Sequence, residues 1–198
     1  MFTVSYTTDY DQVKTVKQLV NDLSRIRVLV GVPEEKAQRP AGENASDITN
    51  AQLVFIHTHG VRRLSMRRAM QQTMQTGATY KQAYAMYIHS YGSPLWQVPP
   101  RPIIEPALKA HNEELQKEIQ KALNQQLTIS GGKQQALRQF KKVAMMGQNF
   151  ARGWFTDGRN GWAPNAPSTI ARKGSNKPLI DTGEMRKSII GIVAVSNK

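Results

Sequence analysis

The sequence predicts a small α+β protein with a mostly antiparallel sheet, two long amphipathic helices and extended loops. Runs rich in β-branched residues, at 25–33 and 188–195, have the length and composition of strands. Apolar residues recur at helical spacing over 104–127 and again over about 133–154. A chain of 198 residues, 39% of them apolar, is expected to fold as a single α+β domain, 1–198.

The N-terminal quarter is predicted to contain a helix, a strand and a loop. Residues 11–24 form an amphipathic helix, and the strand at 25–33 ends at Gly-Val-Pro, which stops ladder pairing. Residues 34–48 have loop composition and little to bury, so they predict an exposed loop. Residues 51–60, AQLVFIHTHG, fit either a second strand or a buried helix, because short apolar runs suit both.

Two short helices are predicted next. Ser65 can cap the first helix, and Gly77 ends it. Thr79 can cap the second, and Gly92 ends it. The apolar face of the second helix would consist of Ala83, Tyr84, Tyr87 and Ile88.

A rigid corner follows. The heptapeptide MYIHSYG (86–92) nearly repeats VFIHTHG (54–60), and only the second copy leads into the proline-rich LWQVPPRPIIEPAL (95–108). Proline fixes its own backbone and restricts the preceding residue, so this segment should set the direction of the chain before the long helix. The predicted corner consists of Gly92, Pro99, Pro100, Arg101 and Pro102.

The two long helices are expected to form an antiparallel hairpin. A Ser-Gly-Gly turn at 130–132 separates them, and such short turns join antiparallel helices. The acids Glu113, Glu114 and Glu118 belong to the solvated face of the first helix. Residues 156–178 then predict a second exposed loop, rich in glycine, proline and basic residues.

Charge is distributed unevenly along the chain. The net charge is +13; residues 1–50 hold 6 basic and 7 acidic residues, 51–130 hold 9 and 4, and 131–198 hold 12 and 3. This concentration of positive charge toward the C-terminal part of the chain indicates a polyanionic neighbour, either nucleic acid or an acidic protein ring. The alternative is that the charge only confers solubility and the C-terminal part is a disordered basic tail.

Two basic groups are candidate polyanion-facing or interface residues. If Ser65 caps a helix, Arg67 and Arg68 lie in its first turn, where positive charge opposes the helix dipole and suggests a partner carboxylate or phosphate. The alternative is that these arginines are only solvated. The second group lies near Trp154 and Trp162, which either stack on single strands or anchor the loop to the core. The candidates are Arg62, Arg63, Arg67, Arg68, Arg159, Arg172, Lys173 and Lys177.

No residue pattern predicts catalysis, a cofactor or a metal. The chain has no nucleophile elbow, phosphate-binding loop, dinucleotide fingerprint or zincin motif. His57 and His59 would share a face on a strand, with His89 as a third ligand, but no carboxylate lies between Asp47 and Glu105 to orient them. We therefore expect packing histidines, no enzyme, and no membrane span, since no eighteen-residue apolar stretch occurs. The absence of cysteine fits synthesis in a reducing cytoplasm.

Two blocks of the sequence resemble a known family. MYIHSYGSPLWQVPPRPIIEPAL (86–108) is similar to an Ile-His-x-aromatic-Gly turn, a Pro-x-Arg-Pro and a helix in the tail-completion (neck, or head–tail joining) proteins of long-tailed bacteriophages. WFTDGRNGWAPNAPSTIARKGSNKPLIDTGEMRKSI (154–189) resembles their Trp- and Pro-rich loop, and is also similar to phage virion-morphogenesis proteins. The chain departs from this pattern at Ser90, often Glu in the family, and at residues 61–85, which look like a helical insertion.

The resemblance implies a structural virion protein at the neck. Such subunits form a homo-oligomeric ring, usually a hexamer, which joins the head connector or stopper proteins to the tail terminator or tail tube and surrounds the DNA path. The implied location is the virion, after synthesis in the host bacterial cytoplasm, with possible non-specific contact to genomic DNA and none to a membrane. The alternative is a non-sequence-specific nucleic-acid-binding protein that uses the basic C-terminal third.

Overall fold

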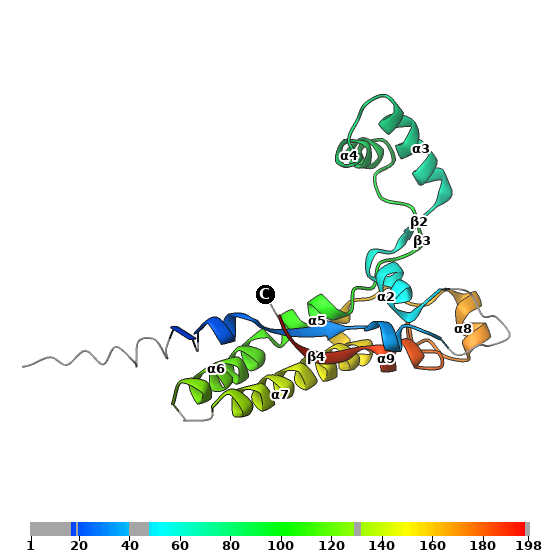
Figure 1. Cartoon of the computed structure of the whole chain (residues 1–198). Helices are drawn as coiled ribbons and strands as arrows, with labels where there is room; N and C mark the ends of the chain where they lie inside the picture. Colours follow the sequence, from blue (N-terminus) through cyan, green and yellow to red (C-terminus); the bar gives the residue numbers. More distant parts are fainter. Residues whose placement is uncertain (1–16, 19, 40–47, 129–131, 197–198) are drawn as a thin grey trace, which may run out of the picture.

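The computed structural model describes residues 17–18, 20–39, 48–128 and 132–196, and it confirms the predicted α+β class (Figure 1). Helices predominate, and the strands form two separate two-stranded antiparallel sheets, β1–β4 and β2–β3, instead of one sheet. Residues 17, 18 and 20–24 are helical, as predicted; the rest of the 11–24 helix lies outside the described residues.

The main sheet joins the two predicted terminal strands. β1 (Ile26–Gly31) pairs antiparallel with β4 (Ile190–Val195), with Ile26 opposite Val195 and Gly31 opposite Ile190. Val28 and Val193 pack against the long helices, while Leu29 and Ile192 are exposed on the other face. One face is therefore covered and the other is open.

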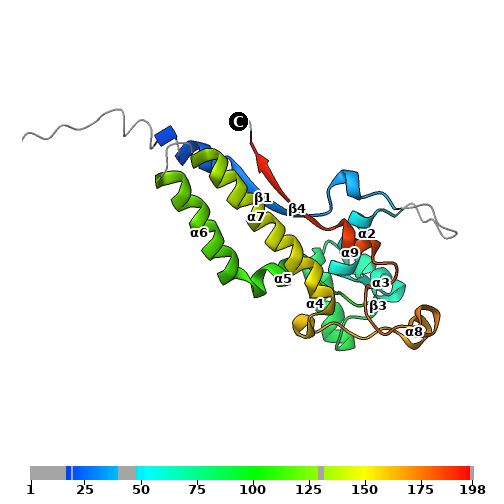
Figure 2. The ribbon, with the colours of Figure 1, turned by 90° about the horizontal axis from the view of Figure 1, so that it is seen from below.

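The covering layer is the predicted helical hairpin. α6 (Asn112–Thr128) and α7 (Gly132–Gly153) lie side by side and antiparallel, and α7 also packs against both strands (Figure 2). Ala122, Ala136 and Phe140 form the core between them. The hairpin prediction is confirmed.

The helix predicted over 104–127 is wrong in one respect, because it is broken. α5 (Ile104–Ala110) ends at His111, whose backbone leaves the helical region (φ −116°, ψ 22°), and α6 starts at Asn112. The ring of His111 stacks on Phe150 of α7 at 3.9 Å between centroids. The stacked residues are far apart in the sequence, so the apolar periodicity of 104–127 does not reveal the break.

The placement of Glu118 on the solvated face is also wrong. Its carboxylate lies largely buried between α6 and α7. Lys121 and Lys142 donate to it at 2.6 and 2.9 Å, and Gln139 donates at 2.7 Å. Glu113 and Glu114 are exposed, as predicted.

Residues 51–60, for which strand and helix both remained open, are helical. α2 (Asn50–His59) begins at a capping box in which Thr49 and Gln52 bond each other's backbone N–H. It ends at Gly60, whose φ of +70° requires glycine. A Cβ at Gly60 would also lie 2.8 Å from Val98 O.

Residues 61–98 form a separate projection, called here the arm. β2 (Val61–Arg62) and β3 (Trp96–Val98) form its stalk, and α3 (Leu64–Gln75) and α4 (Tyr80–Tyr91) stand away from the rest of the molecule (Figure 1). The two helices have their own core: Met66, Met70, Ala83 and Tyr87. The arm contains the predicted insertion 61–85 and extends beyond it.

Three of the four helix-end residues predicted in the arm are confirmed, and one of them is Gly77, which follows the C-cap Thr76 of α3 with a φ of +92°. Thr79 forms a capping box with Gln82, and Gly92 ends α4 in the left-handed region. The Ser65 cap is wrong: α3 begins at Leu64, with Arg63 in the cap position and no side-chain cap. The Arg63 N–H instead donates to Leu95 O in the stalk, so the stalk fixes where α3 starts.

The two predicted loops have different outcomes. In 34–48, residues 34–36 form a 3-10 helix, and 40–47 lie outside the described residues. The 156–178 prediction is wrong as a pure loop, because 3-10 turns at Trp154–Thr156 and Gly158–Asn160 precede α8 (Pro167–Lys173). α8 starts with proline and ends at the left-handed Gly174, a pattern typical of short helices. α9 (Glu184–Ser188) then leads into β4.

Candidate functional site: a polar cleft and a basic arm

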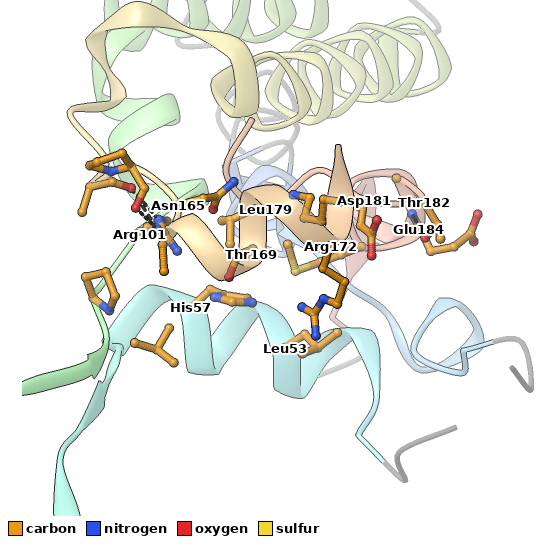
Figure 3. Close-up of a pocket in the computed structure, with 18 of the residues that line it drawn as sticks. Leu53, His57, Arg101, Asn165, Thr169, Arg172, Leu179, Asp181, Thr182 and Glu184 are labelled. Carbon is orange, nitrogen blue, oxygen red and sulfur yellow. Dashed lines mark hydrogen bonds between the residues drawn. The ribbon is translucent and has the colours of Figure 1, made fainter. Parts of the chain in front are cut away.

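A cleft of about 840 Å³ lies between α2 and the segment that runs from Ala163 through α8 to Met185. Figure 3 shows Leu53 and His57 of α2 on one wall. Arg101 lies at one end, and Asp181 and Glu184 lie toward the other. A second core, centred on Ile103, Phe155 and Ile189, lies beside the cleft. The cleft therefore sits where sequence-distant segments meet.

Arg101 holds the two sides of this region together. Its side chain is 7% exposed, and it donates from Nε and Nη2 to Ala163 O at 3.1 and 2.8 Å and from Nη2 to Pro164 O at 3.0 Å. Its backbone N–H donates to His57 O at 2.6 Å. Burial lowers the pKa of Arg101. One cation thus ties α2, the corner and the loop before α8 together.

The two sequence blocks that resemble the phage family meet at this point. Arg101, from the first block, binds carbonyls of the second. In return, the indole Nε1 of Trp162 donates to Pro102 O at 3.1 Å, and its ring packs edge-on against Phe155. Pro99, Pro100 and Pro102 connect the arm to α5, whereas Gly92 lies within the arm, at the end of α4.

Three buried polar atoms beside the cleft have no hydrogen-bond partner within the described part of the chain: Asn50 Oδ1, His57 Nδ1 and Asn165 Nδ2. Burial, and then the charge of Arg101, lowers the pKa of His57, so the ring is neutral near pH 7. A neutral imidazole can donate or accept one hydrogen bond at each nitrogen. The cleft wall can therefore bond polar groups of either kind.

The acids of the C-terminal third, Asp157, Asp181 and Glu184, do not all lie at the cleft. Asp157 pairs with Arg159 at 2.6 Å, and hydrogen bonds from Arg159 lower the pKa of Asp157 to about 2. Asp181 and Glu184 line the cleft, and Glu184 also pairs with Lys187 at 3.2 Å. Within the described residues, no group of three histidine or carboxylate side chains is placed to bind a metal. His57 and His59 lie on a helix, not on the strand considered from sequence.

Two of the four candidate cations of the C-terminal third, Arg159 and Lys173, have side-chain contacts within the fold. Arg159 binds Asp157, lies 3.1 Å from His111 Nε2 and covers the ring of Trp154. Lys173 donates to Lys177 O at 2.9 Å, and Arg172 lines the cleft. Trp154 is buried and Trp162 packs on the core, so the interpretation of both as loop anchors is confirmed.

The four arginines of the arm have two different environments. The guanidinium of Arg62 lies 5.3, 4.8 and 5.4 Å from the ring centroids of Tyr80, Tyr84 and Trp96. This cation–π contact fixes the stalk against α4. The other three, Arg63, Arg67 and Arg68, are exposed.

Sequence reasoning missed Asn50 and Asn165 as cleft residues. Asn50, Leu53 and His57 follow helical i, i+3, i+7 spacing and share the cleft wall, so recognising the Thr49 capping box would have revealed them. Asn165 lies in irregular backbone, where no periodic signal exists.

Comparisons with protein-family models, curated sequences and solved structures find no match for this chain. Across the described residues, no helix combines the length and apolarity that crossing a bilayer demands.

Proposed function

We propose that the chain is a structural subunit of the neck of a long-tailed bacteriophage, joining the head connector to the tail. The observation that carries the proposal is the contact between the two sequence blocks that resemble the tail-completion family. Arg101 and Trp162, one from each block, bond backbone carbonyls of the other block. This contact supports treating the blocks as parts of one unit instead of two chance similarities.

The chemistry of these residues agrees with a scaffold role. Arg101 uses its donors on main-chain carbonyls, and Trp162 uses its indole N–H in the same way. The family-like residues therefore maintain the fold, and the proposed mechanism is assembly through matched shape and charge without bond chemistry.

Exposed apolar side chains provide surfaces for self-association into the proposed ring. On the open face of the main sheet, Leu29 and Ile192 are 47% and 40% exposed. On α2, Phe55 is 64% exposed. Neighbouring apolar residues on a surface are typical of protein–protein interfaces, and six copies would concentrate positive charge around a central path.

The proposal is tested by electron microscopy of particles made by a phage that encodes this chain, after its gene is disrupted. We expect filled heads and free tails that are not joined, and joined particles again when the wild-type chain is supplied from a plasmid. Normal joined particles in the disrupted phage would refute the neck assignment.

A further inference from the structure

The charged side chains of the arm are all of one sign. No Asp or Glu occurs between residues 48 and 104, and the arm itself holds five basic residues. Four of them are exposed: Arg63, Arg67, Arg68 and Lys81. The arm therefore presents positive charge that no carboxylate of its own can neutralise.

The C-terminal third is richer in basic residues, but several of them form ion pairs or hydrogen bonds within the fold. Lys142, Arg159 and Lys187 form ion pairs. Arg152 donates to Ile189 O and Lys187 O, and Arg186 donates to Arg152 O. These cations maintain the fold, so the sequence count overstates the charge that this region offers to a partner.

The arm is also built to hold its charges in place. Arg62, locked among three aromatic rings, fixes the stalk, and the helices above it are closed by their own core. Arg67 borders a hollow of about 520 Å³ beside Arg62, Tyr80 and Trp96. Arg63 and Arg67, four residues apart, are close neighbours at the start of α3, and Arg68 follows.

We propose that the arm binds duplex DNA through its phosphates, without reading sequence. The centre of a protein–protein interface is depleted of charged residues, whereas protein–DNA interfaces are strongly positive. A surface with exposed cations and no carboxylate fits a protein–DNA interface. The biological role of this binding, contact with DNA that passes through the neck, rests on the proposed function. The DNA binding itself is inferred from the charge of the arm and is independent of that function.

Fluorescence anisotropy with a random-sequence duplex tests this inference, using the full chain at several salt concentrations. The arm variant R63Q/R67Q/R68Q is compared with K117Q/R138Q/K141Q, which removes three exposed cations from the α6–α7 hairpin. Both variants lose the same net charge at exposed positions, so both should keep the wild-type circular dichroism spectrum and melting temperature.

We expect the wild type to bind with a steep salt dependence, since each phosphate contact contributes about 0.9 to the slope of log K against log salt. The arm variant should bind at least about tenfold more weakly, with the slope reduced by about 2 to 3, and the hairpin variant should stay within about threefold of wild type. No binding by the wild type at about 50 mM salt, or equal losses in both variants, would overturn the inference. Either of these outcomes would refute DNA binding by the arm. The neck proposal is tested separately, and it stands as long as the disrupted phage fails to join heads to tails.

Discussion

Arg101 illustrates how a single residue can define the region around the cleft. It lies at the end of a proline-rich corner, where the backbone has little freedom, and its planar guanidinium reaches two successive carbonyls of the loop before α8. The sequence identified Arg101 and its prolines as a fixed point. It could not identify the partners, because backbone carbonyls about sixty positions away have no residue signature.

Replacing Arg101 with Ala should lower the free energy of unfolding by about 3 kcal/mol, because buried carbonyls lose charge-assisted hydrogen bonds. Arg101→Lys should recover only part of this, since an ammonium cannot reproduce the planar fork. Urea unfolding measures both. The control is Arg172→Ala at the exposed cleft edge, expected within about 0.5 kcal/mol of wild type. Equal midpoints for all four proteins would contradict the role given to Arg101.

Glu118 predicts how stability depends on pH. Hydrogen bonds from Lys121 and Lys142 lower the pKa of its carboxyl from 4.5 to about 2. A lowered native pKa stabilises the fold at pH values above the unfolded pKa, and this contribution disappears as the pH falls from about 4.5 toward 2. Glu118→Gln should therefore destabilise the protein at pH 7 and show a smaller loss of stability on acidification.

Urea midpoints at neutral pH and near pH 3 measure this effect. Glu113→Gln, on the exposed side of the same helix, is the matched control and should follow the wild-type pH profile. A Glu118→Gln profile parallel to that of the wild type would show that the Glu118 ion pairs do not contribute to stability.

At the scale of elements, the contact of α7 with β4 is so close that it requires glycine. The backbone of Ala144 occupies the space that a Cβ on Gly191 would need. The Gly191 N–H donates to Gln148 Oε1 at 3.1 Å, so the helix also satisfies a strand amide. Helix and strand therefore cannot separate without losing both packing and a hydrogen bond.

Gly191→Ala should cost about 2 kcal/mol or more, because the added methyl group collides with main chain that cannot move aside easily. Gly31→Ala, in the strand that pairs with β4, meets nothing within 4 Å and should be close to neutral. Thermal unfolding of the two variants measures the difference. If both variants melt together, the close packing described for α7 is wrong.

The elements that the sequence predicted best are those with local signals. Thr79 and Gly92 delimit α4 because caps act within one helical turn. The break at His111 coincides with stacking of its ring on Phe150, a contact between helices that local periodicity does not contain. α8 is only seven residues long, too short for a periodic pattern to stand out in a proline-rich segment.

For the whole molecule, the main feature beyond the sequence prediction is a body with a projecting arm. The sequence shows the total charge and its distribution along the chain. Which cations meet a carboxylate or another internal partner depends on the folded structure. The same limit applies to the cleft, whose walls come from α2, the corner and residues 163–185. The hydrophobic pattern predicts where the helices lie in the sequence, but the position of the cleft depends on contacts between elements that are distant in the sequence.

The arm should be removable without unfolding the body. Arg63 and Leu95 are joined by a backbone hydrogen bond of 2.8 Å, so residues 63–95 can be replaced by an Asn-Gly turn that favours a hairpin. Because the arm has a separate core, the shortened chain should keep a cooperative thermal transition and the hydrogen-exchange protection of α7. An insoluble product, or loss of protection in α7, would show that arm and body fold as one unit.

The most direct test of the neck assignment is the position of this chain in a finished particle. Phage particles that carry an epitope-tagged, functional copy can be purified, labelled with gold-conjugated antibody and imaged by electron microscopy. The neck proposal predicts label at the junction of head and tail. Particles that contain no tagged chain, or that carry it along the tail or over the head surface, would contradict the proposal.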